Sequence, residues 1–187
     1  MAEQSTTKVI TDVVRFSYCH VFKPQSVEEG GEKKYSVNVL IDKKNKALVK
    51  KIREAIEAAK EEGKAKTFAG KIPANCKVPL RDGDEERPED ETYAGMYFIN
   101  ATSKTKPGII DRNKVEITDE DEFYSGCFGR ISMNFYAFNT KGNKGIAAGL
   151  NNLQKVKDGE RLSGRASAGA DFGDDFELPE DDDDPLG

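Results

Sequence analysis

Five stretches of the chain carry the side-chain pattern of β-strands. Residues 8–22 are rich in β-branched and aromatic side chains and predict a long first strand, whose imperfect alternation suits a bend. Residues 35–41 alternate between apolar and polar side chains and predict a half-buried strand. The same criteria predict further strands at 93–101, 127–139 and 144–156.

One helix is predicted over 43–62, where apolar side chains recur at helical spacing. Its apolar stripe consists of Leu48, Ile52, Ile56 and Ala59. Asp42 is the predicted N-cap, and Gly63 is the predicted residue just past the C-terminus. Residues 64–92 show no period and are interpreted as irregular. The sequence therefore predicts a mainly-β protein, an oligonucleotide-binding-fold-like barrel of five strands with one amphipathic helix and long loops.

Length and composition exclude several classes of protein. The chain has 187 residues, which suits one domain at 1–160, followed by a flexible linker and an acidic tail at 161–187. No run approaches the ~18 apolar residues that span a bilayer, and the N-terminus lacks a signal-peptide pattern, so we expect a cytoplasmic protein. Three scattered cysteines and one histidine suit neither a zinc site nor a nucleophile triad. We therefore expect no catalytic residue, no metal and no cofactor.

The formal net charge of −5 conceals a strong segregation of charge. Residues 171–187 contain nine acids and no Lys or Arg, which leaves 25 acids against 29 bases in the body. Seven of the remaining acids lie in 82–91 and five in 116–122. The segment 82–91 has the carboxylates of a Mg²⁺ or Ca²⁺ site but not the EF-hand spacing, so we interpret it as a solvated loop. Most of the remaining body is basic, which suits a polyanionic partner.

The strand at 127–139 has the clearest candidate binding face. Its odd positions from Gly129 to Ala137 are apolar and suit a core, which leaves the even positions on the outside. Rings on such a face stack on the bases of a single strand, and cations follow its phosphates. The candidate contacts here are Arg130, Asn134 and Tyr136. For Phe128 and Phe138, packing at the barrel end is the favoured interpretation.

Further candidates lie on the first strand and in loops. Arg15 suits either a nucleic-acid contact or a solvated surface position, and Tyr18 suits a contact or a core position with a hydrogen-bonded hydroxyl. The loop and hairpin cations, which become a site only if they line one groove, are Arg81, Lys104, Lys106, Arg112, Lys141 and Lys144.

The acidic tail is the other candidate for function. Its predicted regulatory residues are Asp171, Phe172, Asp174, Asp175, Phe176, Asp181, Asp182, Asp183 and Asp184. Carboxylates spaced like phosphates, with rings in place of bases, mimic nucleic acid and, tethered to the body, would compete with DNA for a groove. The alternatives are docking of the tail to partner proteins and a purely solubilising tail.

Several stretches together resemble a family of phage single-stranded-DNA-binding proteins, long catalogued as a domain of unknown function. They are VRFSYCHVFKP (14–24), KYSVNVLI (34–41), KVPLRDGDEE (77–86), YFINATSKTKPGIID (97–111), EFYSGCFGRISMNFYAFN (122–139) and GNKGIAAGLNNLQKVKDGERL (142–162). The resemblance implies an oligonucleotide-binding fold and a role in phage replication or recombination. The end, DDDDPLG, is similar to the acidic tips of bacterial and T7-type single-strand-binding proteins, although the bacterial tip ends in Pro-Phe.

Two functions are consistent with these features. The first is a non-enzymatic protein that coats single-stranded DNA in an infected bacterial host, with replication or recombination proteins as tail partners, no membrane partner, and oligomers possible. The second is a DNA-mimicking protein that inhibits a host nuclease or polymerase. A nuclease, which rests on the acidic segment alone, is a distant third.

Overall fold

Five strands of the chain close into a ring. The structure is a computed structural model that describes residues 7–26, 31–140 and 142–162. The ring strands are, in order, β2 (Val14–Gln25), β3 (Lys34–Asp42), β5 (Met96–Ser103), β8 (Asn143–Lys157) and β7 (Phe128–Thr140). All neighbours pair antiparallel except β5 and β8, which are parallel, and β7 closes the ring on β2. The predicted mainly-β class with a five-stranded ring and one main helix is confirmed, although the ring is not an even barrel.

Several short elements were not predicted as separate strands or helices. The predicted first strand is split, because β1 (Lys8–Ile10) pairs with β7 before the chain bends and enters β2. The region interpreted as irregular contains β4 (Arg81–Asp82), α2 (Gly83–Glu86) and η1 (Glu91–Tyr93), and β6 (Gly108–Ile110) pairs with β8. Elements of two to four residues are too short to leave a period in the sequence.

The main helix, α1 (Lys46–Lys66), begins and ends a few residues later than predicted. Asn45 is its N-cap, because its side-chain oxygen accepts a hydrogen bond from the Leu48 amide at 3.2 Å, whereas Asp42 still belongs to β3. Gly63 is buried inside the helix, where a Cβ would collide with the Cβ of Ala137 on β7. Gly63 is therefore a close-approach position and not the C-terminal glycine that the pattern predicted.

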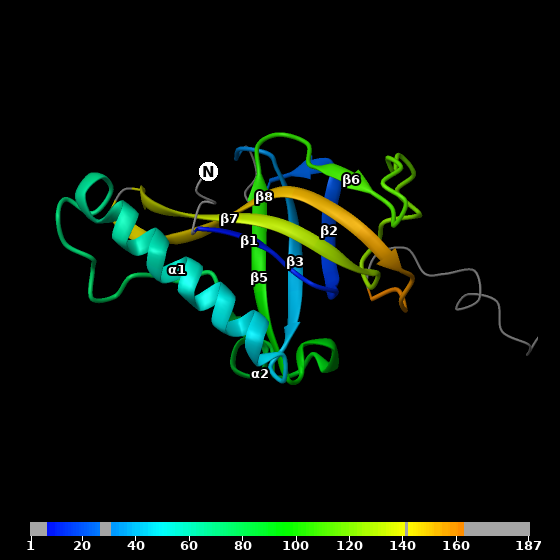
Figure 1. Cartoon of the computed structure of the whole chain (residues 1–187), viewed down its shortest axis with the longest axis horizontal. Coiled ribbons are helices and arrows are strands. Elements are labelled where there is room, and N and C mark those ends of the chain that lie inside the picture. The colour runs from blue at the N-terminus through cyan, green and yellow to red at the C-terminus, as the bar shows by residue number, and fades with distance from the viewer. Residues whose placement is uncertain (1–6, 27–30, 141, 163–187) are drawn as a thin grey trace, which may run out of the picture.

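The core fills the ring and the space beneath α1. Buried apolar side chains from the ring strands meet the helical stripe of Leu48, Ile52 and Ile56. In Figure 1, α1 runs diagonally from the ends of β3 and β5 toward the tip of the β7–β8 hairpin. No helix of the described residues is long and apolar enough to cross a membrane.

Alternation leaves one side of β3 and β5 outside the ring. On that side the register places Asn38 opposite Asn100 and Ser36 opposite Thr102. The neighbouring positions on the inner side, such as Val37 and Ile99, are fully buried. On the outer face Asn100 is exposed and Ser36 and Thr102 are half-buried, whereas Asn38 is buried and donates a hydrogen bond to Tyr93.

Candidate nucleic-acid interface

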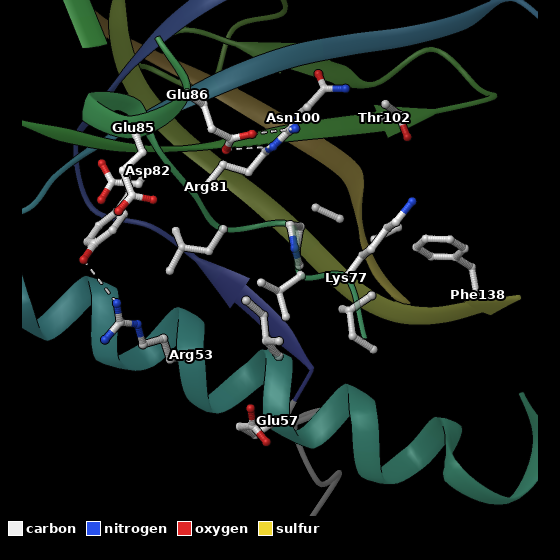
Figure 2. A pocket seen from close by; sticks show the side chains of 18 residues that line it. Arg53, Glu57, Lys77, Arg81, Asp82, Glu85, Glu86, Asn100, Thr102 and Phe138 are labelled. Carbon is white, nitrogen blue, oxygen red and sulfur yellow. Dashed lines mark hydrogen bonds and ion pairs between the residues drawn. The ribbon is translucent and has the colours of Figure 1, made fainter. Parts of the chain in front are cut away.

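An open groove crosses this outer face beside α1. It has a volume of about 1200 Å³ and lies between α1, the segment 77–82 and strands β5, β7 and β8 (Figure 2). A smaller hollow of about 290 Å³ lies beside the start of β3. Both are lined by Asn100 and Thr102 of β5, so they adjoin each other at this strand. We name the two hollows together the outer groove.

Cations, rings and amides line the larger hollow of the outer groove, together with the carboxylates of Glu57, Asp82, Glu85 and Glu86. Arg53 of α1 donates a hydrogen bond from Nη2 to the Tyr97 hydroxyl at 3.2 Å, and its guanidinium lies 5.5 Å from the Tyr97 ring centroid. Lys77 is exposed and lies beside Phe138 in Figure 2. Among the described residues no carboxylate lies within ion-pairing distance of Lys77 Nζ. The charge of Lys77 is therefore available to an external anion.

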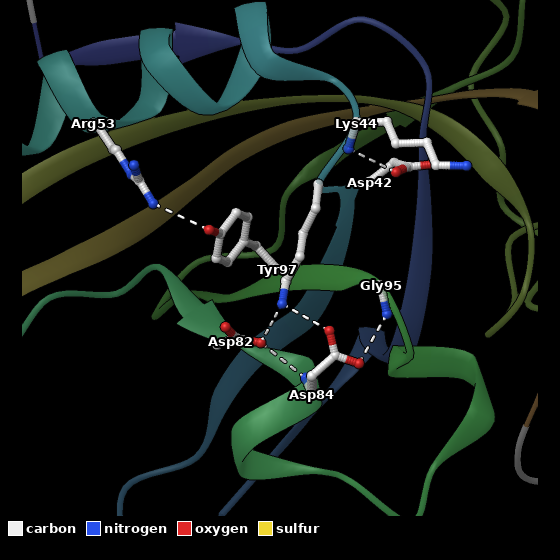
Figure 3. A network of polar contacts seen from close by, with 8 residues as sticks. Asp42, Lys44, Arg53, Asp82, Asp84, Gly95 and Tyr97 are labelled. Atoms are coloured by element: carbon white, nitrogen blue, oxygen red, sulfur yellow. Dashed lines mark hydrogen bonds and ion pairs between the residues drawn. The ribbon is translucent and has the colours of Figure 1, made fainter.

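The acidic segment 82–91 is folded onto neighbouring cations. Lys43 Nζ lies 2.7 Å from both Asp82 Oδ1 and Asp84 Oδ2. In Figure 3 the carboxylates of Asp82 and Asp84 lie close together, and Asp84 also accepts a hydrogen bond from the Gly95 amide. These contacts hold the pKa of each aspartate below its usual value and raise the pKa of Lys43. Glu86 Oε1 lies 2.7 Å from Arg81 Nη2. Three of the seven acids are thus paired within the chain, and this part of the groove edge is less negative than the sequence indicates.

The predicted face of β7 does point outward. Tyr136 is 44% exposed, while Ile131, Met133 and Phe135 are buried. Tyr136 is opposite Ala147, which lines the outer groove, and its ring lies beside Gly149 of β8. The other two candidates hold the N-terminal segment onto β7. Arg130 Nε donates to the Thr11 carbonyl at 2.8 Å, and Asn134 Oδ1 accepts from the Thr7 hydroxyl at 3.2 Å.

Arg15 and Tyr18 of β2 have different surroundings. Arg15 donates from Nε to the Gly126 carbonyl at 3.1 Å and from Nη2 to the Glu160 carbonyl at 2.9 Å. It therefore ties the segment after β8 to the body. Tyr18 is 41% exposed, and its hydroxyl accepts a hydrogen bond from Arg87 Nη1 at 3.3 Å.

The structure does not gather all the predicted loop cations into one groove. Arg81 lines the outer groove, and Lys144 adjoins it because its carbonyl accepts from the Lys77 amide at 3.3 Å. Lys104 adjoins the smaller hollow, because its Nζ is 3.3 Å from Glu32, which lines that hollow. Lys106 lies 5.6 Å from the Phe22 ring centroid, Arg112 is exposed in the turn after β6, and neither lines the groove. Lys141 and the nine predicted tail residues lie outside the described residues.

Sequence reasoning missed four residues of the groove and one beside it. The four that line the groove are Arg53, Lys77, Asn100 and Thr102. Asn100 and Thr102 alternate with buried side chains of β5, and that signal was readable. Arg53 and Lys77 carry no local signal, because many Lys and Arg side chains of this chain are simply solvated. Arg87, whose guanidinium lies over three aromatic rings, was overlooked because it falls within the acidic run.

Comparison with known proteins confirms the family that the sequence stretches indicated. Residues 7–185 match the family described as the ssDNA-binding protein of Enterobacter phage Enc34. The chain is 32% identical over 179 residues to the putative protein p50 of Acyrthosiphon pisum secondary endosymbiont phage 1, with 92% of this chain and 96% of that protein covered.

Solved structures agree with this assignment. The single-stranded DNA-binding protein from bacteriophage Enc34 in complex with ssDNA is 31% identical, with a TM-score of 0.76, and 84% of this chain and 90% of that chain are covered. The single-stranded DNA-binding protein gp2.5 of bacteriophage T7, at 16% identity and a TM-score of 0.54 over 89% of this chain and 99% of that chain, shares the fold. This chain therefore belongs to the family of the Enterobacter phage Enc34 ssDNA-binding protein.

Proposed function

We propose that this chain binds single-stranded DNA without catalysis and coats it during phage replication or recombination in the cytoplasm of an infected bacterium. The family supports this proposal, since the related Enc34 protein, at 31% identity, was solved in complex with ssDNA. The observation that carries the proposal is the outer groove, where exposed cations, ring faces and amides adjoin on the outside of the five-stranded ring.

Each kind of side chain in the groove has a separate role in this proposal. Lys77 and Arg53 neutralise phosphates, which supplies most of the sequence-independent affinity. The rings of Phe138 and Tyr136 offer stacking faces that accept any base. Asn100 adds a hydrogen-bonding amide where the two hollows adjoin. This set suits a flexible single strand whose bases are unpaired and accessible.

The acidic tail is proposed to compete with DNA for this groove. The tail carries nine acids and no Lys or Arg, whereas the body carries 29 bases and 25 acids. A tail tethered by a short linker reaches an effective concentration of order mM, so it displaces weakly bound strands and yields to tightly bound ones. In the alternative role of the tail, the same nine acids bind basic pockets of replication proteins.

Binding of a fluorescein-labelled oligo(dT) to the full-length chain tests the proposal by fluorescence anisotropy. We expect binding that weakens with salt at a log–log slope of about −0.7 per neutralised phosphate, and an oligonucleotide that stays intact with Mg²⁺. Failure of both the full-length chain and residues 1–170 to bind would overturn the proposal and favour the DNA-mimicking inhibitor.

Removal of residues 171–187 tests the role of the tail separately. The truncated chain should bind oligo(dT) more tightly than the full-length chain, most clearly at low salt, because the competitor is gone. A full-length control with Asp181, Asp182, Asp183 and Asp184 changed to Asn keeps the length and removes charge, and it should bind with intermediate affinity. Unchanged or weaker binding after truncation would show that the tail does not compete.

A further inference from the structure

Tyr18 occupies a β-bulge that turns its side chain out of the ring. The register pairs Ser17 with Asn38 and His20 with Ser36, so two residues of β2 lie opposite the single residue Val37. Strict alternation would direct Tyr18 inward, yet its side chain is 41% exposed. β-Bulges re-aim side chains and are frequent near functional sites.

The backbone of Tyr18 is strained. Its φ is +47°, in the left-handed region that bulky L-residues rarely adopt. Glycine or asparagine would occupy such a position at lower cost. Strain of this kind persists only where the surrounding structure imposes it, and it gathers at ligand-binding positions. An exposed aromatic ring contributes little to the core, so the strained conformation of Tyr18 is better explained by contact with an external ligand.

Arg87 is fixed beside this ring by a set of aromatic side chains. Its guanidinium carbon lies 5.1 Å from the ring centroid of Tyr18, 4.8 Å from that of Tyr93 and 5.1 Å from that of Phe98. The two latter rings are buried, meet edge to face at 5.1 Å, and are held by a 2.8 Å hydrogen bond from Asn38 to the Tyr93 hydroxyl. Arg87 therefore rests on a rigid base.

Arg87 forms no ion pair with the residues that the structure describes, although it belongs to the acidic run. The nearby Glu86 is bound to Arg81 instead. Arg81 also lies 5.7 Å from the Phe98 ring, so this cluster adjoins the outer groove that Arg81 lines.

We propose that Tyr18 and Arg87 form a platform that extends the outer groove and holds one nucleotide of a single strand. The base stacks on the exposed Tyr18 ring, and the guanidinium of Arg87 binds the adjoining phosphate. Because stacking requires only a π-face, the platform accepts any unpaired base. This inference rests on the proposed binding of single strands and assigns one position in it.

A tryptophan reporter tests the stacking directly. The chain contains no Trp, so Tyr18→Trp in the full-length protein introduces a single fluorophore at the platform. Its emission should fall when oligo(dT) binds, because a base stacks on the indole. The matched control is Val115→Trp, at a position that is 59% exposed in the connection after β6, whose emission should stay unchanged. An unchanged Tyr18→Trp signal under conditions where anisotropy shows binding would overturn the platform, as would equal quenching in both variants.

Affinity measurements separate the two side chains. Tyr18→Leu should weaken binding about tenfold with an unchanged salt slope, and Tyr18→Phe, which keeps the ring, should restore most of that loss. Arg87→Gln should reduce the log–log salt slope by about 0.7, because one phosphate contact is lost. Wild-type affinity in both Tyr18→Leu and Arg87→Gln would overturn the inference.

The same experiments keep this inference distinct from the proposed function. If the wild-type chain binds no oligonucleotide, the proposed function fails and the platform fails with it. Only the platform fails if the wild-type chain binds while the emission of Tyr18→Trp stays unchanged, as in Val115→Trp, and Tyr18→Leu and Arg87→Gln keep the wild-type affinity. Should Tyr18→Leu not fold, the fluorescence of Tyr18→Trp decides.

Discussion

At the scale of single residues, the surroundings of each cation separate those that hold the fold from those that are free to bind. Arg15 and Arg130 were candidate DNA contacts in the sequence, and each donates to backbone carbonyls of the chain itself. Lys77 has no ion-pair partner among the residues that the structure describes, and it lines the outer groove. The identity of a side chain is local information, but the availability of its charge depends on its partners.

Lys77→Gln should therefore weaken the binding of oligo(dT) and lower the log–log salt slope by about 0.7, because one phosphate loses its cation. The melting temperature should stay unchanged, since the Lys77 side chain is exposed. Anisotropy titrations at several salt concentrations measure both quantities. Lys114→Gln, in an exposed turn outside the groove, is the control and should keep the wild-type slope. Equal slopes in all three proteins would exclude Lys77 from the phosphate path.

At the scale of elements, α1 is positioned by one glycine. Its apolar stripe and its existence were predictable from helical spacing, but the role of Gly63 was not. Gly63 looked like the end of the helix, whereas it lies inside α1 where the helix contacts Ala137 of β7. A pattern shows which face of a helix is buried, and the neighbour that covers that face decides how small a residue must be.

Gly63→Ala should lower the free energy of unfolding by about 1–3 kcal/mol, because overpacking at this contact exceeds the gain of up to about 1 kcal/mol in helix propensity. Urea denaturation measures the change. The double variant Gly63→Ala with Ala137→Gly removes the opposing Cβ and should recover most of the lost stability. If Gly63→Ala alone stabilises the protein, the close approach of α1 and β7 is not a constraint.

At the scale of the whole molecule, charge is balanced between segments that are distant in the sequence. The acidic segment 82–91 is held against the β3–α1 connection by Lys43, which contacts Asp82 and Asp84. The net charge of −5 describes neither this pairing nor Lys77 in the groove, a cation unpaired among the described residues. The residues that line the larger hollow come from α1, the segment 77–82, β5, β7 and β8, and only ring closure brings them together.

This pairing predicts a pH dependence of stability. The pKa values of Asp82 and Asp84 are lowered in the folded state, so their stabilising contribution is present at neutral pH and is lost as the pH falls through those lowered values. Lys43→Met should therefore be less stable than the wild-type chain at pH 7, and the difference should shrink toward pH 3. Denaturation at a series of pH values measures it, with the exposed Lys44→Met as the control. A difference that is constant with pH would show that the ion pairs do not stabilise the fold.

The sequence by itself determined local properties. It determined the existence of α1 and the ring strands and the buried and exposed sides of β7, because periodicity records which side of an element is shielded from water. It also determined the family, because the characteristic stretches are recognised without knowledge of the fold. Only the tertiary structure decided which strands pair, which cations remain free, and that Tyr18 turns outward beside Arg87. Those features depend on contacts between segments such as β2 and residues 83–93, and a hydrophobic pattern does not specify the partner against which a side is buried.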